Sequence, residues 1–239
     1  MSTIWSAVTD METTDTSHPR PIRLVLFDLD GTFADTAPDL AFALNRTLVA
    51  NGRPQLPLES IRLQVSHGAV ALITLGFGIE SDHPRFDTYR EQLLDIYKNH
   101  LARETTLFPG MEELLGQLEQ RDIPWGIVTN KPGWLTEPLM RQLGLSDRAA
   151  AIVSGDTTDY RKPHPMPIIH ACGLARRDPA ETLYIGDARR DIEAGNSAGN
   201  RTLTALFGYI GNEDNPEEWG ADGAIDHPLQ VLNWIDRDF

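Results

Sequence analysis

In the stretch Leu24-Val25-Leu26-Phe27-Asp28-Leu29-Asp30-Gly31-Thr32, an apolar run ends abruptly in two aspartates, a glycine and a threonine. An uninterrupted apolar run is typical of a strand that is buried on both faces of a parallel sheet. Gly31 allows the chain to turn directly after this strand. Open α/β sheets place their ligands at the carboxyl ends of their strands, so the stretch predicts a reactive centre.

The two aspartates are separated by a single residue, which has a chemical consequence. Side chains at i and i+2 of an extended segment share a face, so Asp28 and Asp30 can point into one crevice. Two anions held that close repel each other and need a cation, a shared proton or a chemical use. An Asx turn is the structural alternative, and it is common for an isolated Asp-Gly. The preceding apolar run favours the reactive centre.

Composition limits the partners. The chain has 239 residues, 41% of them hydrophobic, which suffices for one large domain or for a domain plus a smaller one. With 21 basic against 35 acidic residues its formal net charge is -14, which disfavours nonspecific nucleic-acid binding. The same charge repels a phosphorylated substrate at long range. A phosphate site must therefore be made locally positive by a metal, a lysine or a helix N-terminus.

Residues 1–20 are rich in Ser, Thr, Asp and Glu and are predicted to form a disordered tail without a signal peptide. No apolar run reaches membrane-spanning length, so no membrane partner is expected. Cys172 is the only cysteine, which excludes an intrachain disulfide and favours a cytoplasmic location. Its apolar neighbours predict a thiol in the core.

Helical signals follow the first strand. Thr36 has the position of an N-cap, Pro38 lies in the first turn, and Asp39 follows three residues after the cap. Further helical patterns cover 58–65, 69–75 and 86–101, and the aromatic stripe of the last one is interpreted as core. About seventy residues without a strand are too many for a βα loop. They predict an inserted helical module at 37–105, with the main domain at 21–36 and 106–239.

From Phe108 onward, helices and strands alternate, which predicts right-handed crossovers and a parallel sheet. The fold class is therefore α/β, a Rossmann-like parallel sheet with the helical module inserted after its first strand. The expected helices are 111–121, 135–143, 168–172, 191–198 and 229–235, and the expected strands are 124–129, 150–154, 182–185, 202–207 and a short one near 224–225.

Three later strand ends deliver polar residues, and parallel strands would bring them to the edge that holds Asp28 and Asp30. They are Thr129-Asn130-Lys131, a loop that contains Lys162, and the segment from Asp187 to Asp191. The carboxylates of Asp28, Asp30 and Asp187 favour a hard cation, most simply Mg²⁺ that retains several waters.

These residue types are suited to phosphoryl transfer. A carboxylate beside a metal ion can attack phosphorus, and a second carboxylic acid can protonate the leaving oxygen and later deprotonate water. Asp28 and Asp30 fit these two roles. Thr129 can bind phosphoryl oxygens, and Lys162 can stabilise the charge that grows during transfer.

Four ordered segments resemble the motifs of the haloacid dehalogenase-like phosphatases: Asp28 to Thr32, Val128-Thr129-Asn130, Lys162-Pro163, and Gly186-Asp187 with Asp191. The resemblance implies that Asp28 is the nucleophile that forms an aspartyl-phosphate and that Asp30 is the general acid and base. It also implies that the helical module is a cap that excludes water. The implied substrate-binding residues are Thr129, Asn130 and Lys162, and the implied Mg²⁺ site comprises Asp28, the Asp30 carbonyl, Asp187 and, directly or through water, Asp191.

Two further stretches resemble the phosphoglycolate phosphatase group, especially its bacterial N-acetylmuramic acid 6-phosphate phosphatases. They are 125–132 and the segment from Gly208-Tyr209-Ile210 to 229. This likeness implies a phosphatase that acts on a small phosphorylated acid, either N-acetylmuramic acid 6-phosphate or 2-phosphoglycolate, with the former pointing to cell-wall recycling. Phe33, His67 and His164 depart from the usual pattern. His67 is predicted to lie in the cap loop and to contact substrate.

Several alternatives remain open at this stage. A dehalogenase would use Asp28 without metal, but enzymes of that class lack an acid at the place of Asp30. A related phosphosugar mutase would retain both aspartates, and a non-enzymatic sugar-phosphate sensor would have lost a motif. Lys131 is either a second phosphate contact or a solvated side chain. The expected partner is a small phosphate ester, and the expected state is a monomer or homodimer.

Overall fold

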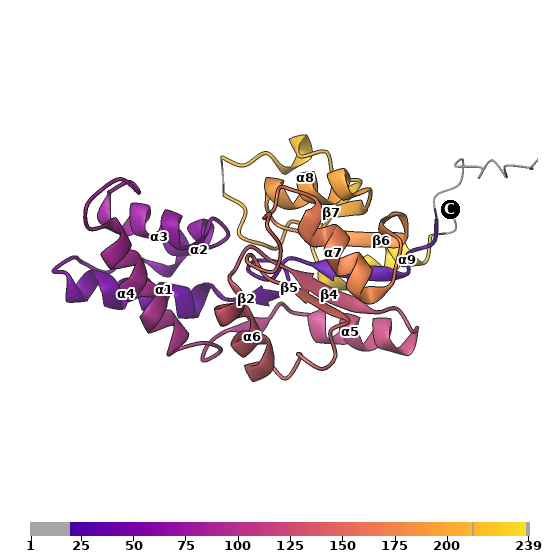
Figure 1. Ribbon diagram of the computed structural model, residues 1–239, viewed down its shortest axis with the longest axis horizontal. Helices are drawn as coiled ribbons and strands as arrows, with labels where there is room; N and C mark the ends of the chain where they lie inside the picture. Colours follow the sequence, from indigo (N-terminus) through magenta and orange to yellow (C-terminus); the bar gives the residue numbers. More distant parts are fainter. Residues whose placement is uncertain (1–19, 212, 238–239) are drawn as a thin grey trace, which may run out of the picture.

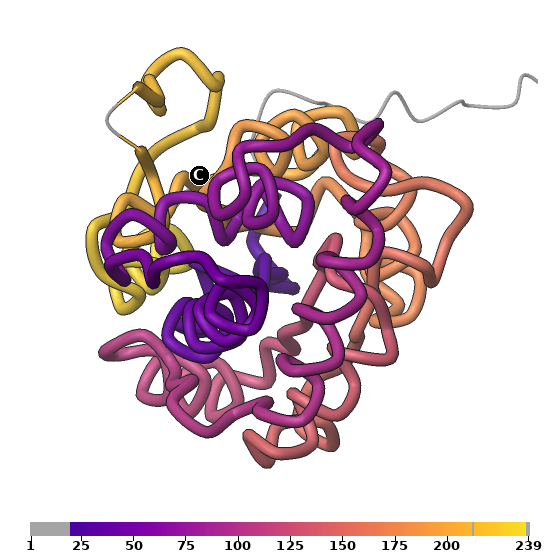
Figure 2. Tube along the Cα trace, turned by 90° about the vertical axis from the view of Figure 1, so that its left-hand side faces the viewer, coloured from indigo at the N-terminus to yellow at the C-terminus, as the bar shows by residue number. Residues whose placement is uncertain are grey.

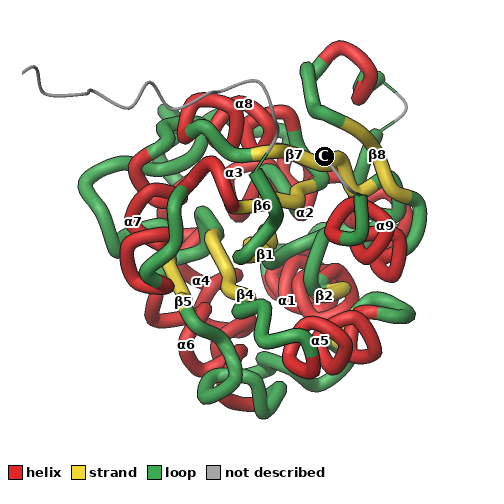
Figure 3. The backbone as a smooth tube through the Cα atoms, turned by 90° about the vertical axis from the view of Figure 1, so that its right-hand side faces the viewer, coloured by secondary structure: helices red, strands yellow, loops and turns green. Residues whose placement is uncertain are grey.

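The computed structural model describes residues 20–211 and 213–237, and its centre is a six-stranded sheet in which every pair of neighbouring strands is parallel. The strand order is β5-β4-β1-β6-β7-β8. Figure 3 shows these strands side by side. The predicted parallel α/β fold is confirmed. The strands are β1 (Leu24–Phe27), β4 (Trp125–Val128), β5 (Ala151–Val153), β6 (Thr182–Gly186), β7 (Arg201–Ala205) and β8 (Gly223–Ile225).

Helices cover both faces of this sheet. In Figure 1, α7 (Met166–Ala175) and α8 (Arg189–Ala198) lie above it, and α5 (Met111–Gln120) and α6 (Gly133–Gln142) lie below. Strand β1 is fully buried, and its side chains alternate between two core clusters, one toward α7 and α8 and one toward α5 and α6. This burial on both faces is the reason why its sequence is continuously apolar. A short helix, α9 (Val231–Ile235), is the last element of the described residues.

Four consecutive helices form the helical module at one end of the molecule, beyond β1 (Figures 1 and 2). They are α1 (Ala37–Ala50), α2 (Leu58–Val65), α3 (Gly68–Phe77) and α4 (Phe86–Lys98). The chain enters the module through β2 (Ala34–Asp35) and leaves through β3 (Thr106–Leu107), and these two strands pair antiparallel. The two connections therefore run side by side. Two-residue strands carry no periodic pattern, so the sequence analysis did not predict them.

The start of α1 differs in detail from the prediction. Thr36 is the N-cap residue as expected, but its side chain makes no capping hydrogen bond. The Thr36 hydroxyl donates instead to Asp30 Oδ1, at 2.5 Å. The Asp39 carboxylate accepts hydrogen bonds from the backbone N–H groups of 103–105, which lie just before β3. The helix start and its N-cap residue were predicted correctly, and both side chains bind groups outside the first turn of α1.

Two predictions about the core are confirmed. The stripe of α4 is largely buried, with Phe86, Leu93 and Tyr97 at 1% exposure or less. The Cys172 thiol is buried as well, and burial raises its pKa. The predicted tail lies almost wholly outside the described residues, which begin at Arg20. None of the helices among the described residues is long and apolar enough to cross a membrane.

Candidate active site

The structure brings the predicted polar residues together at the carboxyl edge of the sheet. Asp28 directly follows β1, Thr129 follows β4, and Asp187 follows β6. Lys162 comes from the loop after β5, and Asp191 lies in the first turn of α8. All five side chains are buried. They meet because parallel strands present their carboxyl ends at one edge.

Lys162 is the central cation of this site, and its side chain is fully buried. Its ammonium lies 2.8 Å from Asp28 Oδ1 and 2.7 Å from Asp191 Oδ1. It also donates to the Val128 carbonyl and to the Tyr184 hydroxyl, each at 2.8 Å. A buried lysine with two carboxylates and two further acceptors is fully satisfied and fixed in position.

Asn130 holds the backbone of this lysine. The Asn130 side chain donates to the Lys162 carbonyl at 2.9 Å and accepts from the Lys162 N–H at 3.0 Å. The adjacent Thr129 Oγ1 accepts the Lys131 N–H at 3.1 Å. The segment after β4 is therefore connected to the loop that carries Lys162. The substrate contacts predicted for Asn130 and Thr129 remain predictions.

The carboxylates of Asp28, Asp187 and Asp191 form a compact acidic cluster. Each offers an oxygen within 4.8 Å of the others, and all three side chains are buried. Burial, reinforced by the Asp28 and Asp191 charges, raises the pKa of Asp187 to about 7. Lys162 offsets only part of this negative charge. Buried oxygen ligands with excess negative charge fit a hard divalent cation such as Mg²⁺.

Two segments of the main domain, the turn after Asp30 and the loop after β7, hold Asp187 in place. Its Oδ1 accepts from the Thr32 hydroxyl at 3.2 Å, and its Oδ2 accepts from the Tyr209 N–H at 2.9 Å. Gly31, with φ +87°, passes so close that a β-carbon there would collide with the Asp187 carboxylate. The turn after Asp30 therefore requires glycine for its backbone angle and for its lack of a side chain.

Asp30 faces away from the acidic cluster. Its carboxylate forms an ion pair with Lys131, with the ammonium 2.8 and 3.0 Å from its two oxygens. The Asp30 carbonyl, which was predicted as a metal ligand, lies 3.4 Å from the Ser66 hydroxyl of the helical module. The side chain and the carbonyl of Asp30 thus face different parts of the site.

Lys131 is a wall residue of the site and is not a solvated loop side chain, since its side chain is only 7% exposed. Burial lowers its pKa, but the Asp30 carboxylate and the Tyr97 side chain together raise it by more, so that the pKa lies above its usual value. The ammonium lies over the Tyr97 ring, 4.9 Å from the centroid. The Tyr97 hydroxyl is buried and makes no hydrogen bond with the described residues.

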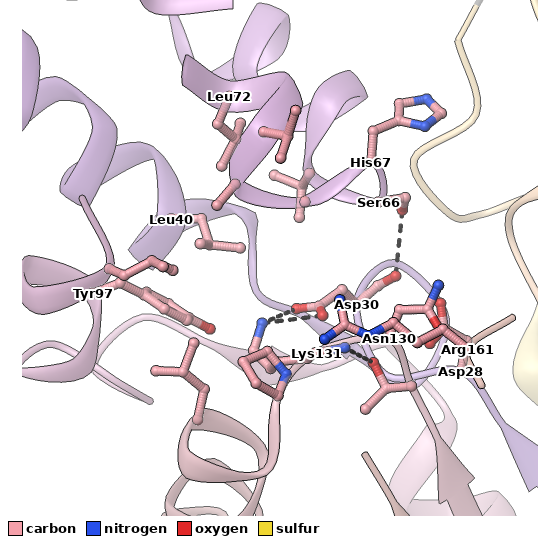
Figure 4. Close-up of a pocket in the computed structure, with 18 of the residues that line it drawn as sticks. Asp28, Asp30, Leu40, Ser66, His67, Leu72, Tyr97, Asn130, Lys131 and Arg161 are labelled. Atoms are coloured by element: carbon pink, nitrogen blue, oxygen red, sulfur yellow. Dashed lines mark hydrogen bonds and ion pairs between the residues drawn. The ribbon is translucent and has the colours of Figure 1, made fainter. Parts of the chain in front are cut away.

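These groups line a cavity of about 390 Å³ between the sheet edge and the helical module (Figure 4). The main domain supplies its charged and polar wall, and the module supplies a mainly apolar one. The lining residues include Asp28, Asp30, Thr129, Asn130, Lys131, Arg161 and Arg190 from the main domain, and Leu40, Val65, Ser66, His67, Leu72, Leu94 and Tyr97 from the module.

His67 lies at the rim of this cavity and is exposed. Figure 4 shows its ring turned away from Asp28 and Asp30, whereas the neighbouring Ser66 is turned toward Asp30. Partial burial and the Arg190 guanidinium lower the pKa of His67. His67 also lines a second cavity, of about 280 Å³, on the Asp187 side of the turn. The structure therefore places His67 between two cavities, and its predicted substrate contact remains a prediction.

The two arginines after Asp187 differ in position. Arg189 is exposed and forms an ion pair with Glu193 at 2.8 Å. Arg190 lines both cavities, and its guanidinium donates to the Ser66 carbonyl at 2.5 Å. Although burial lowers the pKa of Arg190, the Asp191, Asp28 and Asp187 carboxylates together with Tyr184 raise it by more.

Three residues contribute to the site without having been predicted from the sequence: Ser66, Tyr184 and Tyr209. Tyr209 donates its hydroxyl proton to Asp35 Oδ1 at 2.6 Å and accepts the Ala37 N–H at 3.0 Å. Its only sequence signal was the stretch 208–210, which was interpreted as a subgroup marker. Tyr184 had the signal of a buried strand residue only, and Ser66 had none beyond its loop position.

Comparison with known proteins agrees with this arrangement. A family model described as haloacid dehalogenase-like hydrolase matches residues 25–205. The N-acetylmuramic acid 6-phosphate phosphatase of Pseudomonas putida is 43% identical over 215 residues, which are 90% of this chain and 96% of that protein. The phosphoglycolate phosphatase of Xanthomonas campestris is 38% identical over 209 residues, 87% of this chain and 94% of that protein.

A solved structure has a similar fold. It is a crystal structure described as a predicted phosphoglycolate phosphatase from Haemophilus somnus, with a TM-score of 0.79 and 26% sequence identity. The match covers 89% of this chain and 97% of that one, so it includes both the sheet and the helical module.

Proposed function

The chain belongs to the haloacid dehalogenase-like hydrolase family and is a phosphoric monoester hydrolase, and from that premise we propose that it is a Mg²⁺-dependent phosphatase of N-acetylmuramic acid 6-phosphate. Asp28 is the proposed nucleophile and Asp30 the general acid and base. The single observation that carries the proposal is the 390 Å³ cavity, which joins Asp28 to an apolar wall of the helical module.

Asp28 is prepared for attack on phosphorus. Its Oδ1 accepts the Leu29 N–H at 2.7 Å and pairs with Lys162, which leaves Oδ2 to attack. The new bond from this oxygen to phosphorus replaces the bond to the leaving oxygen, and an aspartyl-phosphate forms. Lys162 and Thr129 stabilise the charge on the phosphoryl oxygens.

Asp30 completes both half-reactions. In its acid form it gives a proton to the leaving oxygen, and as a carboxylate it then takes a proton from water. The water oxygen attacks phosphorus, the bond to Asp28 breaks, and inorganic phosphate leaves. The contacts of Asp30 with Thr36 and Lys131 hold its carboxyl group on the cavity side of Asp28.

The proposed metal site comprises Asp28, Asp187, the Asp30 carbonyl and, directly or through water, Asp191. The fit rests on the buried cluster of three carboxylates, whose charge one lysine does not balance. When bound, Mg²⁺ supplies positive charge beside the phosphoryl group and a fixed orientation for its oxygens.

The cavity favours N-acetylmuramic acid 6-phosphate over 2-phosphoglycolate. Its volume of about 390 Å³ falls in the range of roughly 300–1,000 Å³ that is usual for ligands larger than a two-carbon acid. The apolar wall suits the methyl groups of the N-acetyl and lactyl substituents. Lys131, Arg161 and Arg190 lie on the opposite side and suit a carboxylate.

We propose in addition that residues 37–105 act as a cap. Antiparallel pairing of β2 with β3 provides two adjacent connections about which the helical module can close and exclude water. The relatives that carry the name N-acetylmuramic acid 6-phosphate phosphatase support the muramic acid ester as the substrate. With that substrate, the proposed role is the recycling of cell-wall sugars in the cytoplasm.

Phosphate release provides the test. The purified protein is supplied with Mg²⁺ and with either N-acetylmuramic acid 6-phosphate or 2-phosphoglycolate, with EDTA as the metal control and Asp28→Asn as the protein control. We expect a kcat/KM of about 10⁴ M⁻¹s⁻¹ or more on the muramic acid ester and a much lower value on the glycolate ester. The reverse preference would refute the substrate. An isomerised sugar phosphate without free phosphate would indicate a mutase.

A further inference from the structure

Ser66 is the one residue of the α2–α3 turn whose side chain reaches the acidic cluster. Its hydroxyl donates to Asp187 Oδ2 at 2.8 Å and lies 3.4 Å from the Asp30 carbonyl oxygen. Figure 4 shows the second of these contacts. Asp187 and the Asp30 carbonyl both belong to the metal site proposed above. A residue of the helical module therefore contacts two proposed metal ligands of the main domain.

The two distances match the spacing of neighbouring metal ligands. Mg²⁺ demands nearly octahedral coordination at about 2.0–2.1 Å, so that adjacent ligand oxygens lie about 3 Å apart. Ser66 Oγ, at 2.8 and 3.4 Å from the two oxygens, has the spacing of a third ligand adjacent to both. We propose that the Ser66 hydroxyl is a metal ligand supplied by the helical module, in a position that water takes when the module is open.

The hydrogen bonding of Ser66 is compatible with this role. A hydroxyl has one proton and two lone pairs. The proton stays on the oxygen and remains donated to Asp187, and a lone pair binds the ion. Serine and threonine hydroxyls serve as Mg²⁺ ligands in nucleotide-binding loops, so the ligand type is chemically reasonable.

The backbone of Ser66 is fixed independently of its side chain. Arg190 donates to the Ser66 carbonyl at 2.5 Å, and Arg190 lies in α8, which begins two residues after Asp187. The helix that follows one metal-binding segment thus holds the turn that carries Ser66. This contact directs the hydroxyl toward Asp187 before any ion binds.

A ligand from the helical module has a thermodynamic consequence. If closure of the module adds a ligand, the ion binds the closed arrangement more tightly, and bound ion favours closure by the same free energy. This inference rests on the proposed Mg²⁺ site. It adds that the module participates in metal binding even without substrate.

The experiment measures metal binding and not turnover. Mn²⁺ is titrated into the full-length protein and followed by electron paramagnetic resonance, with Mg²⁺ as competitor, for wild type, Ser66→Ala, Ser66→Thr and Ser60→Ala. Ser60 is the matched control because it lies on α2 and its exposed hydroxyl contacts only the Pro57 carbonyl. Water-proton relaxation of the Mn²⁺ complexes counts the bound waters.

We expect Ser66→Ala to weaken metal affinity about 10-fold, the lower end for lost support of a metal site, and to gain one bound water. Ser66→Thr should restore both values, and Ser60→Ala should change neither. Equal affinity and equal water count in wild type and Ser66→Ala would overturn the inference while leaving the proposed function intact. The inference would also be overturned if Ser66→Thr, with a circular dichroism spectrum like that of the wild type, failed to restore metal binding. A wild type that binds neither ion would overturn both.

Discussion

The two aspartates after β1 stand one residue apart but in different electrostatic surroundings. Asp28 lies in the acidic cluster, where Lys162 pairs with it at 2.8 Å. Asp30 pairs with Lys131 on the cavity side, outside that cluster. The separation suits a division of labour in which one carboxylate binds metal and phosphorus while the other exchanges protons with the leaving group and water.

Asp28→Asn tests the nucleophile. The amide retains the shape of the side chain but is not nucleophilic, so turnover should fall by about 10⁴-fold or more. The circular dichroism spectrum should match that of the wild type, since the side chain keeps its size. Phosphate release provides the measurement. Near wild-type release by a variant of verified sequence would exclude Asp28 as the nucleophile.

Lys162→Met tests the buried cation. The substitution leaves the Asp28 and Asp191 carboxylates without their shared lysine, and loss of one partner from a buried ion pair costs about 3–5 kcal/mol. The free energy of unfolding, measured in urea, should fall by that amount. Arg189→Met, which removes an exposed pair with Glu193, should change it by less than about 1 kcal/mol. If both variants lowered the free energy of unfolding by the same amount, Lys162 would not be the central cation of the site.

Tyr97→Phe tests the buried Tyr97 hydroxyl, which has no hydrogen-bond partner among the described residues of the free protein. Such a group costs about 1–3 kcal/mol. Removal of the hydroxyl should therefore leave the free energy of unfolding unchanged or raise it, while kcat/KM for the muramic acid ester falls because the cavity loses a donor. Leu93→Ala, in the same stripe, should lower stability. A Tyr97→Phe variant with full activity would show that the hydroxyl does not bind substrate.

Among the secondary-structure elements, one side chain of α1 reinforces the connection between the two parts of the molecule. Asp39, in the first turn of α1, accepts the N–H groups of 103–105 and the Thr105 hydroxyl, the latter at 2.7 Å. These residues lead directly into β3, which pairs with β2. The entry and exit of the helical module are therefore joined by a buried carboxylate as well as by a two-residue ladder.

Asp39→Ala should loosen this connection. The backbone N–H groups of 103–105 would lose their acceptor, at a cost of about 1–3 kcal/mol for each one that stays buried without a partner. Hydrogen exchange at 103–107 should accelerate, whereas exchange in β1 should hold at wild-type rates. Asp39→Asn keeps one acceptor oxygen, so its exchange rates at 103–107 should lie between those of the wild type and those of Asp39→Ala. Unchanged exchange at 103–107 in Asp39→Ala would mean that the β2–β3 pairing alone fixes the connection.

Features that depend on a local sequence pattern were predicted correctly, whereas contacts between residues far apart in the sequence were not. β1 and β4 were predicted because burial on both faces gives an uninterrupted apolar run, which is a local signal. Thr36 was correctly predicted as the N-cap residue, but the contact of its hydroxyl with Asp30, six residues away across a turn, was not predicted. Ser66 contacts Asp187 across 121 residues, and no local pattern encodes such a pair. The site was predictable at strand ends, and the part contributed by the module was not.

The whole molecule has a net charge of -14, yet several of its lysine and arginine side chains lie together where an anionic substrate would bind. Lys131, Arg161 and Arg190 all line the cavity, and Lys162 lies beneath it beside Asp28. An acidic chain needs such local positive charge to bind an anion, and the fold assembles it from the loops after β4 and β5 and from α8. Even so, the acidic cluster retains more negative charge than Lys162 offsets, so the fold itself is under electrostatic repulsion until a cation binds.

Because of this repulsion, we expect Mg²⁺ to reverse the order of thermal stability of the wild type and Asp187→Asn. Without metal, Asp187→Asn should melt at a higher temperature than the wild type, because it removes one of three buried carboxylate charges. With Mg²⁺ at about 100 times its Kd, the wild type should gain about 2.7 kcal/mol from binding, whereas the variant, which lacks a ligand, should gain little. Thermal unfolding with EDTA and with Mg²⁺ measures both orders. Asp159→Asn, at an exposed position, should follow the wild type in both conditions. If Mg²⁺ leaves the melting temperature of the wild type unchanged, this cluster binds no cation. Binding of a divalent cation by three buried carboxylates would have to raise the stability of the folded protein.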